Sequence, residues 1–183
     1  ATSSPSIEWH ESDVTSLPFK DASFDIAFVS SGYDFPDKPA ALSEVRRVLA
    51  PGKSVVLTVW SAVSPLFAAI AEACDRYIGP EASTSALSPF AYRDIKVIKA
   101  LLLEAGFPEV KVDPLAVERR IGPAKEAIPK KIAGAPVGTL MAKLDGPTQK
   151  PLYDDIEEAL SGYVVNGGIV VPQEAHLIQA TKP

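Results

Sequence analysis

The feature that most constrains this sequence is a pair of apolar segments separated by one amphipathic segment. Residues Phe24 to Ser30 are almost continuously apolar, and Ser54 to Trp60 are apolar and rich in β-branched side chains. Both patterns are typical of strands covered on both faces in a parallel sheet, so we expect the first to be central. Between them, apolar residues recur at helical spacing from Ala41 to Leu49, and Pro51 and Gly52 predict the end of that helix. The three segments predict a right-handed crossover that joins two parallel strands.

The segments on either side continue an alternation of strands and helices. A short strand pattern at Ile7 and Trp9 precedes the crossover, and a predicted loop from Thr15 to Asp21 connects this strand to the Phe24 segment. Beyond the crossover, the pattern predicts helices over Pro65 to Ile78 and Ile95 to Ala105, a strand over Val110 to Val117 broken at Pro114, and a final strand over Ala175 to Thr181.

The stretch from Pro123 to Gly162 differs from the rest in being rich in Ala, Gly, Lys and Pro. It contains helical patterns at Ala124 to Ile132 and Leu152 to Leu160. We interpret residues 123–162 as an inserted helical cap, and residues 1–122 and 163–183 as an α/β core.

Composition excludes several classes of partner. The 183 residues carry a formal net charge of -5, and the Lys and Arg residues are scattered, so we expect no nucleic-acid partner. No segment approaches the roughly 18 apolar residues that a transmembrane helix needs, so we expect no membrane partner. The single cysteine, Cys74, lies in an apolar helical segment, which favours a buried, inert thiol and a cytoplasmic protein.

Several short motifs occur in a fixed order along the chain. They are Ser12-Asp13-Val14, Leu17-Pro18-Phe19, Asp21-Ala22-Ser23-Phe24-Asp25, Arg46-Arg47-Val48-Leu49-Ala50-Pro51-Gly52 and Leu102-Leu103-Glu104-Ala105-Gly106-Phe107. Their order and spacing resemble class I S-adenosylmethionine-dependent methyltransferases of the ubiquinone and menaquinone biosynthesis type. The resemblance implies a Rossmann-like sheet, mostly parallel with an antiparallel last strand. It also implies S-adenosylmethionine as cofactor and a small molecule as methyl acceptor.

The same resemblance assigns residues to the cofactor. Asp13 matches the acid that accepts a hydrogen bond from the adenine amine, and Val14 matches the residue whose backbone amide contacts the adenine ring. Asp13 could instead only cap the turn after its strand. Ser30 and Ser31 match the segment that lines the methionine half of the cofactor.

Catalytic and substrate residues are expected next to these positions. Tyr33 and Asp34 follow Ser31 and could orient the acceptor or take its proton; alternatively, Tyr33 only packs under the adjacent helix. Trp60 and Phe67 would lie beneath the cap and form an apolar pocket for an uncharged or aromatic acceptor.

Other polar residues are weaker candidates. Arg46 and Arg47 are predicted to lie on a solvated helix face. No cluster of His, Cys or acidic residues has metal-ligand spacing, so we predict no metal site.

The resemblance also places two strands of the family before this sequence begins, with the glycine-rich loop and the ribose-binding acid. In the family these strands lie between the Ile7 and Phe24 strands, so we expect the chain to be a fragment or truncated form whose Phe24 strand has an exposed apolar edge. Such an edge favours pairing with another chain, including a homo-oligomer. Two functions follow: methyl transfer to a small acceptor, or a non-catalytic binding or interaction protein derived from that fold.

Overall fold

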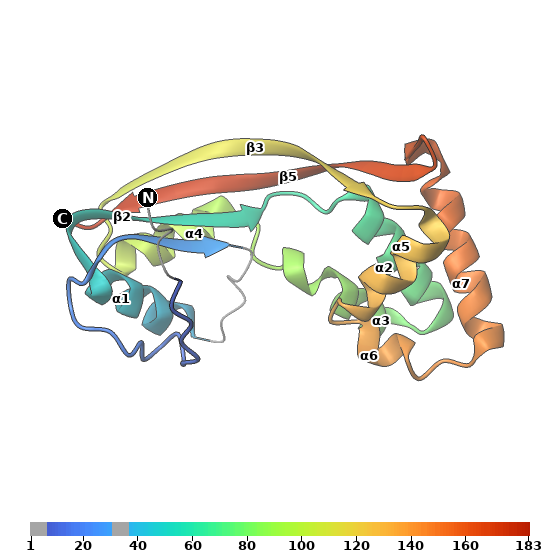
Figure 1. The fold of residues 1–183 in the computed structure, drawn as a ribbon, viewed down its shortest axis with the longest axis horizontal. Coiled ribbons are helices and arrows are strands. Elements are labelled where there is room, and N and C mark those ends of the chain that lie inside the picture. The colour runs from blue at the N-terminus through green and yellow to red at the C-terminus, as the bar shows by residue number, and fades with distance from the viewer. Residues whose placement is uncertain (1–6, 31–36) are drawn as a thin grey trace, which may run out of the picture.

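The chain folds into two groups of helices joined by a long β-ribbon (Figure 1). The computed structural model describes residues 7–30 and 37–183. The strands are β1 (Phe24–Ser30), β2 (Leu49–Trp60), β3 (Glu109–Ile121), β4 (Val164–Val165) and β5 (Gly168–Thr181). The helices are α1 (Lys38–Val48), α2 (Pro65–Tyr77), α3 (Pro80–Leu87), α4 (Ile95–Glu104), α5 (Ala124–Ala133), α6 (Gly138–Met141) and α7 (Gly146–Ala159), with 3₁₀ turns η1 (Ser88–Phe90) and η2 (Ser161–Tyr163).

The sheet has the strand order β1-β2-β5-β3, with β4 pairing at the far end of β5. β1 and β2 are parallel neighbours joined through α1, as the crossover pattern predicts. β5 runs antiparallel to both β2 and β3, so β1, β2 and β3 point in one direction and the last strand in the other. The predicted Rossmann-like α/β sheet with an antiparallel last strand is therefore confirmed.

Local sequence explains where these elements begin and turn. The carboxylate of Asp37 accepts a hydrogen bond from the Ala40 amide and caps α1, and Pro39 occupies the first helical turn. β4 and β5 form a hairpin through Asn166 and Gly167, whose φ angles of 50° and 79° are those favoured by an Asn-Gly turn.

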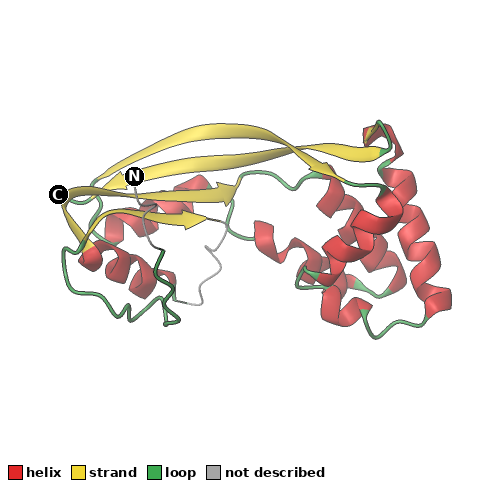
Figure 2. Ribbon diagram, viewed as in Figure 1, coloured by secondary structure: helices red, strands yellow, loops and turns green. Residues whose placement is uncertain are grey.

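Two apolar cores lie along the sheet. The first is formed by α1, α4 and strand residues such as Leu57 and Ile178, and we call this part the sheet lobe. The second is formed by α2, α3, α5, α6 and α7 with Ile169 and Val171, and we call it the helical lobe. Figure 2 shows the helices of the two lobes at opposite ends of the β3–β5 ribbon. The ribbon is the element that contributes buried side chains to both cores.

Helices occur where the sequence predicts the cap. α5 and α7 overlap the two predicted helices, and α6 lies between them. The core they form also includes α2 and α3, which come earlier in the sequence. The division into a core of residues 1–122 and 163–183 and a cap of residues 123–162 stays a prediction.

Three details of the predicted strands are wrong. Ile7 and Trp9 form no strand and are 75% and 89% exposed, because no strand lies beside them to supply hydrogen bonds among the described residues. β3 continues through Pro114, which a strand at the sheet edge tolerates because an outward-facing position needs no N–H donor. β1 is an edge strand and not a central one.

The exposed edge predicted for β1 is present among the described residues. Ala27 and Val29 pack on the sheet-lobe core, whereas Ile26 and Phe28 point to the other face and are 47% and 71% exposed. An apolar edge strand of this kind is a template for pairing with another strand.

The prediction that Arg46 and Arg47 lie on a solvated face is also wrong. The Arg47 guanidinium pairs with Glu44 and Asp21 at 2.7 Å and donates hydrogen bonds to the carbonyls of Leu17 and Phe19. Arg46 donates through Nε to the Gly106 carbonyl at 3.1 Å. Both arginines are half-buried because they satisfy backbone oxygens of neighbouring loops.

Glu44 completes this attachment of the Leu17 loop to α1. Its carboxylate accepts hydrogen bonds from Arg47 and from the Leu17 amide at 2.8 Å, and together these lower the pKa of Glu44 from 4.5 to about 2. Because the folded pKa is depressed, this contribution to stability is complete above pH 4.5 and is lost as the pH falls towards 2.

We therefore predict that Glu44→Gln lowers the urea midpoint at pH 7, and that its difference from the wild-type chain shrinks as the pH falls from 4.5 to 2. Urea unfolding followed by circular dichroism across this range measures the effect. The control is Glu11→Gln, at an exposed position in the segment that precedes the Leu17 loop, and it should leave the urea midpoint unchanged. A pH-independent difference for Glu44→Gln would contradict the linkage.

Cys74 is fully buried in the helical-lobe core, as predicted for an inert thiol. Desolvation by burial raises the pKa of this thiol from 9.0 to about 11. Because the thiolate is the reactive form, the folded protein should be resistant to thiol reagents near pH 8.

We predict that a chromogenic disulfide reagent titrates no thiol in the folded chain at pH 8 and one thiol per chain in urea. Rapid labelling of the folded protein would show that α2 opens readily and would contradict this packing.

Candidate functional site

A cavity of about 170 Å³ lies at the carboxyl ends of β1 and β2. This is the edge at which open α/β sheets bind ligands. Four strands supply its lining, which combines two hydroxyl side chains with apolar residues: Ser30, Thr58, Val59, Trp60, Leu115, Val117 and Ala175. Strand register explains this grouping, because Trp60 pairs with Ala175 and Ala175 pairs with Leu115 across the sheet.

Ser30 and Trp60, both predicted site residues, meet at this cavity. The Thr58 hydroxyl donates a hydrogen bond of 3.4 Å to the Ser30 hydroxyl, so the two strand ends present adjacent polar groups. Ser31, Tyr33 and Asp34 lie outside the described residues. Their assignment to the cofactor and the acceptor stays a prediction.

Three aromatic rings connect the cavity to the helical lobe. The Trp60 ring lies 6.2 Å from that of Phe90, and Phe90 contacts Phe67 edge-on at 5.1 Å. Phe90, on η1, was not predicted from the sequence; the Ser-Pro-Phe turn that presents it carries no helical or strand periodicity. Phe67 and Phe90 are buried, so Trp60 is the ring of the three with an exposed part.

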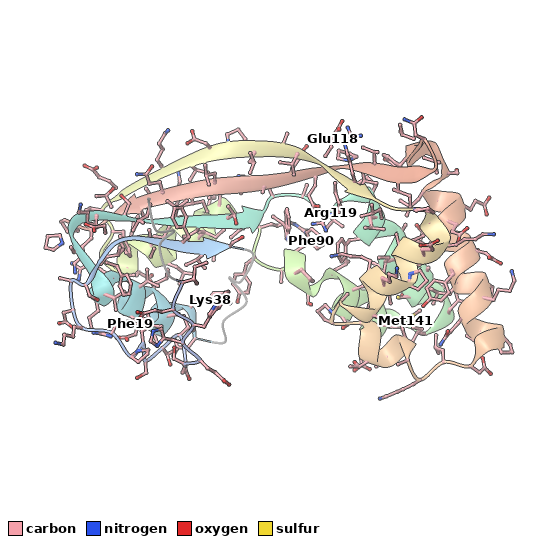
Figure 3. All side chains as sticks on the ribbon, in the orientation of Figure 1. Phe19, Lys38, Phe90, Glu118, Arg119 and Met141 are labelled. Atoms are coloured by element: carbon pink, nitrogen blue, oxygen red, sulfur yellow. The ribbon has the colours of Figure 1, made fainter. Side chains whose placement is uncertain are left out.

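Two cationic side chains flank these rings. Arg119 follows Leu115 and Val117 on the same face of β3, and its guanidinium carbon lies 5.8 Å from the centre of the Trp60 ring. Lys131, on α5, places Nζ 5.4 Å from the centre of the Phe67 ring. Figure 3 shows Arg119 and Phe90 where the sheet meets the helical lobe. Sequence reasoning missed both cations because neither belongs to a motif.

Burial and the positive charge of Arg119 both change the pKa of Lys131. Partial burial lowers the pKa of Lys131, and the positive charge of Arg119 lowers it further. Arg119 also donates through Nε to Oε1 of Gln173 at 2.6 Å, and Gln173 is 2% exposed. Two like charges therefore face one region between the lobes.

The Asp13 side chain stabilises the turn that begins at Asp13 by accepting hydrogen bonds from Thr15. Its Oδ1 accepts hydrogen bonds from the Thr15 amide at 2.8 Å and the Thr15 hydroxyl at 2.7 Å, and these lower the pKa of the carboxyl group. Asp13 is exposed, and both of these bonds use Oδ1, which leaves Oδ2 directed to neither donor. The turn-capping role is thus present, and the assignment of Asp13 to the adenine amine stays a prediction.

A second cavity in the described part of the chain contains charged groups that are already paired. It lies between α2 and α7 and contains Arg76 and Asp155, which pair with each other and with Glu72 and Tyr77. No group of three metal-ligating side chains occurs among residues 7–30 and 37–183. No helix in the same ranges is long and apolar enough to cross a membrane.

Comparison with known proteins shows similarity to methyltransferases. Residues 1–57 match a family described as a methyltransferase domain. The chain is 31% identical over 122 residues to 2-phytyl-1,4-naphtoquinone methyltransferase of Synechococcus elongatus, and 34% identical over 113 residues to demethylmenaquinone methyltransferase of Staphylococcus epidermidis. These alignments cover 60% and 55% of this chain and 52% and 47% of those proteins. The chain thus spans about half the length of the curated relatives that it matches.

Solved structures agree at the level of the fold. A methyltransferase structure from Bacillus halodurans has a TM-score of 0.56 at 20% identity, covering 97% of this chain and 78% of that one. A type II methyltransferase structure from Anaeromyxobacter dehalogenans has a TM-score of 0.59 at 15% identity, covering 100% and 74%. At these identities the likeness shows the fold alone.

The fold is therefore the Rossmann-like fold of methyltransferases. Together with the family match and the quinone methyltransferase relatives, it confirms the resemblance of this chain to class I S-adenosylmethionine-dependent small-molecule methyltransferases. The match also supports S-adenosylmethionine as the cofactor.

Proposed function

We propose that this chain provides the acceptor side and the adenine end of a methyltransferase that transfers a methyl group from S-adenosylmethionine to a small aromatic acceptor. The observation that carries the proposal is the cavity at the carboxyl ends of β1 and β2, where Ser30 and Trp60 come together. The names of the relatives support a quinone-type or related aromatic acceptor.

The residues of this chain would hold the cofactor by hydrogen bonds. Oδ2 of Asp13 can accept from the adenine amine while Oδ1 keeps the Thr15 turn, and the Val14 amide follows directly in the chain. The Ser30 and Thr58 hydroxyls can bond the amino-acid end. When bound, the sulfonium supplies an electrophilic methyl group, and its displacement depends mainly on alignment with the acceptor.

The acceptor would lie against Trp60. Phe67, which is 6% exposed, would support that ring from behind through Phe90. Tyr33 and Asp34 remain our candidates for orienting the acceptor or taking its proton. We also propose that the cap of residues 123–162 selects the acceptor, and that the buried free Cys74 suits a cytoplasmic protein.

One observation favours the alternative, a non-catalytic binding protein. The Asp13 carboxylate already has a structural task in the Thr15 turn, which would keep it in place without any cofactor. Cofactor binding separates the two functions.

We predict that S-adenosylmethionine binds and that Asp13→Asn weakens its binding at least about tenfold, or roughly 1.4 kcal/mol. An asparagine keeps an oxygen for Thr15 but presents an amide donor to the adenine amine, so the turn should survive while the contact is lost. Isothermal titration calorimetry measures the affinity, and an unchanged thermal midpoint verifies the fold.

The control is Asp25→Asn, at an exposed position on β1 that pairs with Lys53 at the other end of the strand. Equal binding by Asp13→Asn and the wild-type chain would contradict the adenine assignment. Absence of binding by this chain, and by a longer chain that includes the glycine-rich loop of the family, would leave the non-catalytic alternative.

We further propose that a second copy of the chain can pair at the free edge of β1. Phe28→Lys places a charge on this edge and should shift any dimer to monomer, because lysine opposes edge-to-edge pairing. Sedimentation velocity measures the shift, and Leu103→Lys, at an exposed position of α4, is the matched control. A wild-type chain that stays monomeric at high concentration would exclude this pairing.

A further inference from the structure

We propose that the methyl acceptor carries an anionic group, a carboxylate or a phosphate, which binds between Arg119 and Lys131 while its aromatic body lies against Trp60. This inference rests on the proposed function, because it assigns the acceptor to the cavity beside Trp60. It departs from the uncharged acceptor expected from the sequence and from the quinones named in the relatives.

A series of side-chain contacts links Arg119 to Lys131. Arg119 lies over Trp60, Trp60 contacts Phe90, Phe90 contacts Phe67, and Lys131 lies over Phe67. Besides burial, the positive charge of Arg119 lowers the pKa of Lys131, so the two cations at the ends of this series interact electrostatically. These residues come from five elements of both lobes, so folding directs two positive charges to the rim of one aromatic wall.

Neither cation is neutralised by an acid in the part of the chain that the structure describes. Among residues 7–30 and 37–183, no carboxylate forms an ion pair with Arg119 or Lys131, whereas Arg120 on the opposite face of β3 pairs with Glu118. Two partly buried like charges repel each other and lose hydration. A bound anion would remove both penalties.

Two buried polar groups near this region can donate hydrogen bonds but have no partner among the described residues. Nε2 of Gln173 and the Ser64 hydroxyl have no hydrogen-bond partner among the described residues, and their side chains belong to residues that are 2% and 3% exposed. The loop that carries Ser64 is held beside Gln173, because the Ser61 amide donates to the Glu174 carbonyl at 3.1 Å. Buried polar groups are normally paired, so these donors indicate a missing acceptor.

Ser64 also precedes α2, a helix of 13 residues, and makes no side-chain capping bond to it. The first turn of α2 therefore adds partial positive charge on the same side. The Arg119 Nη atoms, Lys131 Nζ and Gln173 Nε2 can only donate hydrogen bonds, and the unpartnered Ser64 hydroxyl can also donate one. Such a set recognises oxyanions.

The experiment compares three probes that share a phenyl group: 3-phenylpropanoate, its neutral amide 3-phenylpropanamide, and benzyl phosphate. Trp9→Phe removes the exposed second tryptophan and leaves Trp60 as the fluorescent reporter. We expect saturable quenching, with the acid binding at least about tenfold more tightly than the amide. Tighter binding of benzyl phosphate than of the acid would assign the site to phosphates, and the reverse to carboxylates.

Two variants in this background test the residues. Lys131→Met should reduce the preference for the acid over the amide about tenfold, whereas Lys130→Met, its exposed neighbour on α5, should not. Gln173→Glu places a carboxylate beside Arg119 and should abolish acid binding without lowering the thermal midpoint, because the new charge takes the place of the ligand.

Equal affinity for acid and amide, no quenching by any probe, or full acid binding by Gln173→Glu would overturn the inference. None of these measurements needs the cofactor. Binding of S-adenosylmethionine is followed separately by calorimetry, so loss of the anion preference with cofactor binding intact refutes this inference alone.

Discussion

The arrangement of this protein depends on the ladder between β3 and β5. Thirteen consecutive residues of β3, Glu109 to Ile121, pair with β5 without an interruption in register. β5 gives Ile178 and Ala180 to the core of the sheet lobe, and Ile169 and Val171 to the core of the helical lobe. A single antiparallel ladder thus sets the distance between the strand ends at the proposed ligand site and the helices that would cover a bound ligand.

Most of the elements of the sheet lobe could be predicted from sequence because they are specified locally. β1, α1 and β2 have apolar patterns with clear periods, and the motifs fix their order. The errors occur where the outcome depends on a neighbour. Ile7 and Trp9 are strand-forming residues, but none of the described strands lies beside them. Arg47 has an exposed helical position until the Leu17 loop folds over it.

Some residues of the candidate site could likewise be predicted from the sequence, and others could not. Ser30 and Trp60 could be predicted, because each ends a strand and strand ends converge. Arg119, Lys131 and Gln173 could not, because their meeting depends on how α5 returns to the ribbon after Ile121. No local sequence pattern indicates that Lys131 and Arg119 interact. Their like charges become informative only once the structure shows that no carboxylate among the described residues forms an ion pair with either of them.

The burial pattern of β5 changes phase along its length. Odd-numbered residues from Ile169 to Ala175 are buried, with Ile169 and Val171 in the helical-lobe core, and even-numbered residues Ile178 and Ala180 are buried in the sheet-lobe core. Because strand side chains alternate with a period of two, inserting one residue near His176 would turn one of these two sets towards solvent. Homologous chains should therefore vary in length at the Asn166-Gly167 turn and keep β3 and β5 at constant length. The distance between the helical lobe and the carboxyl ends of β1 and β2 should then be the same in all of them.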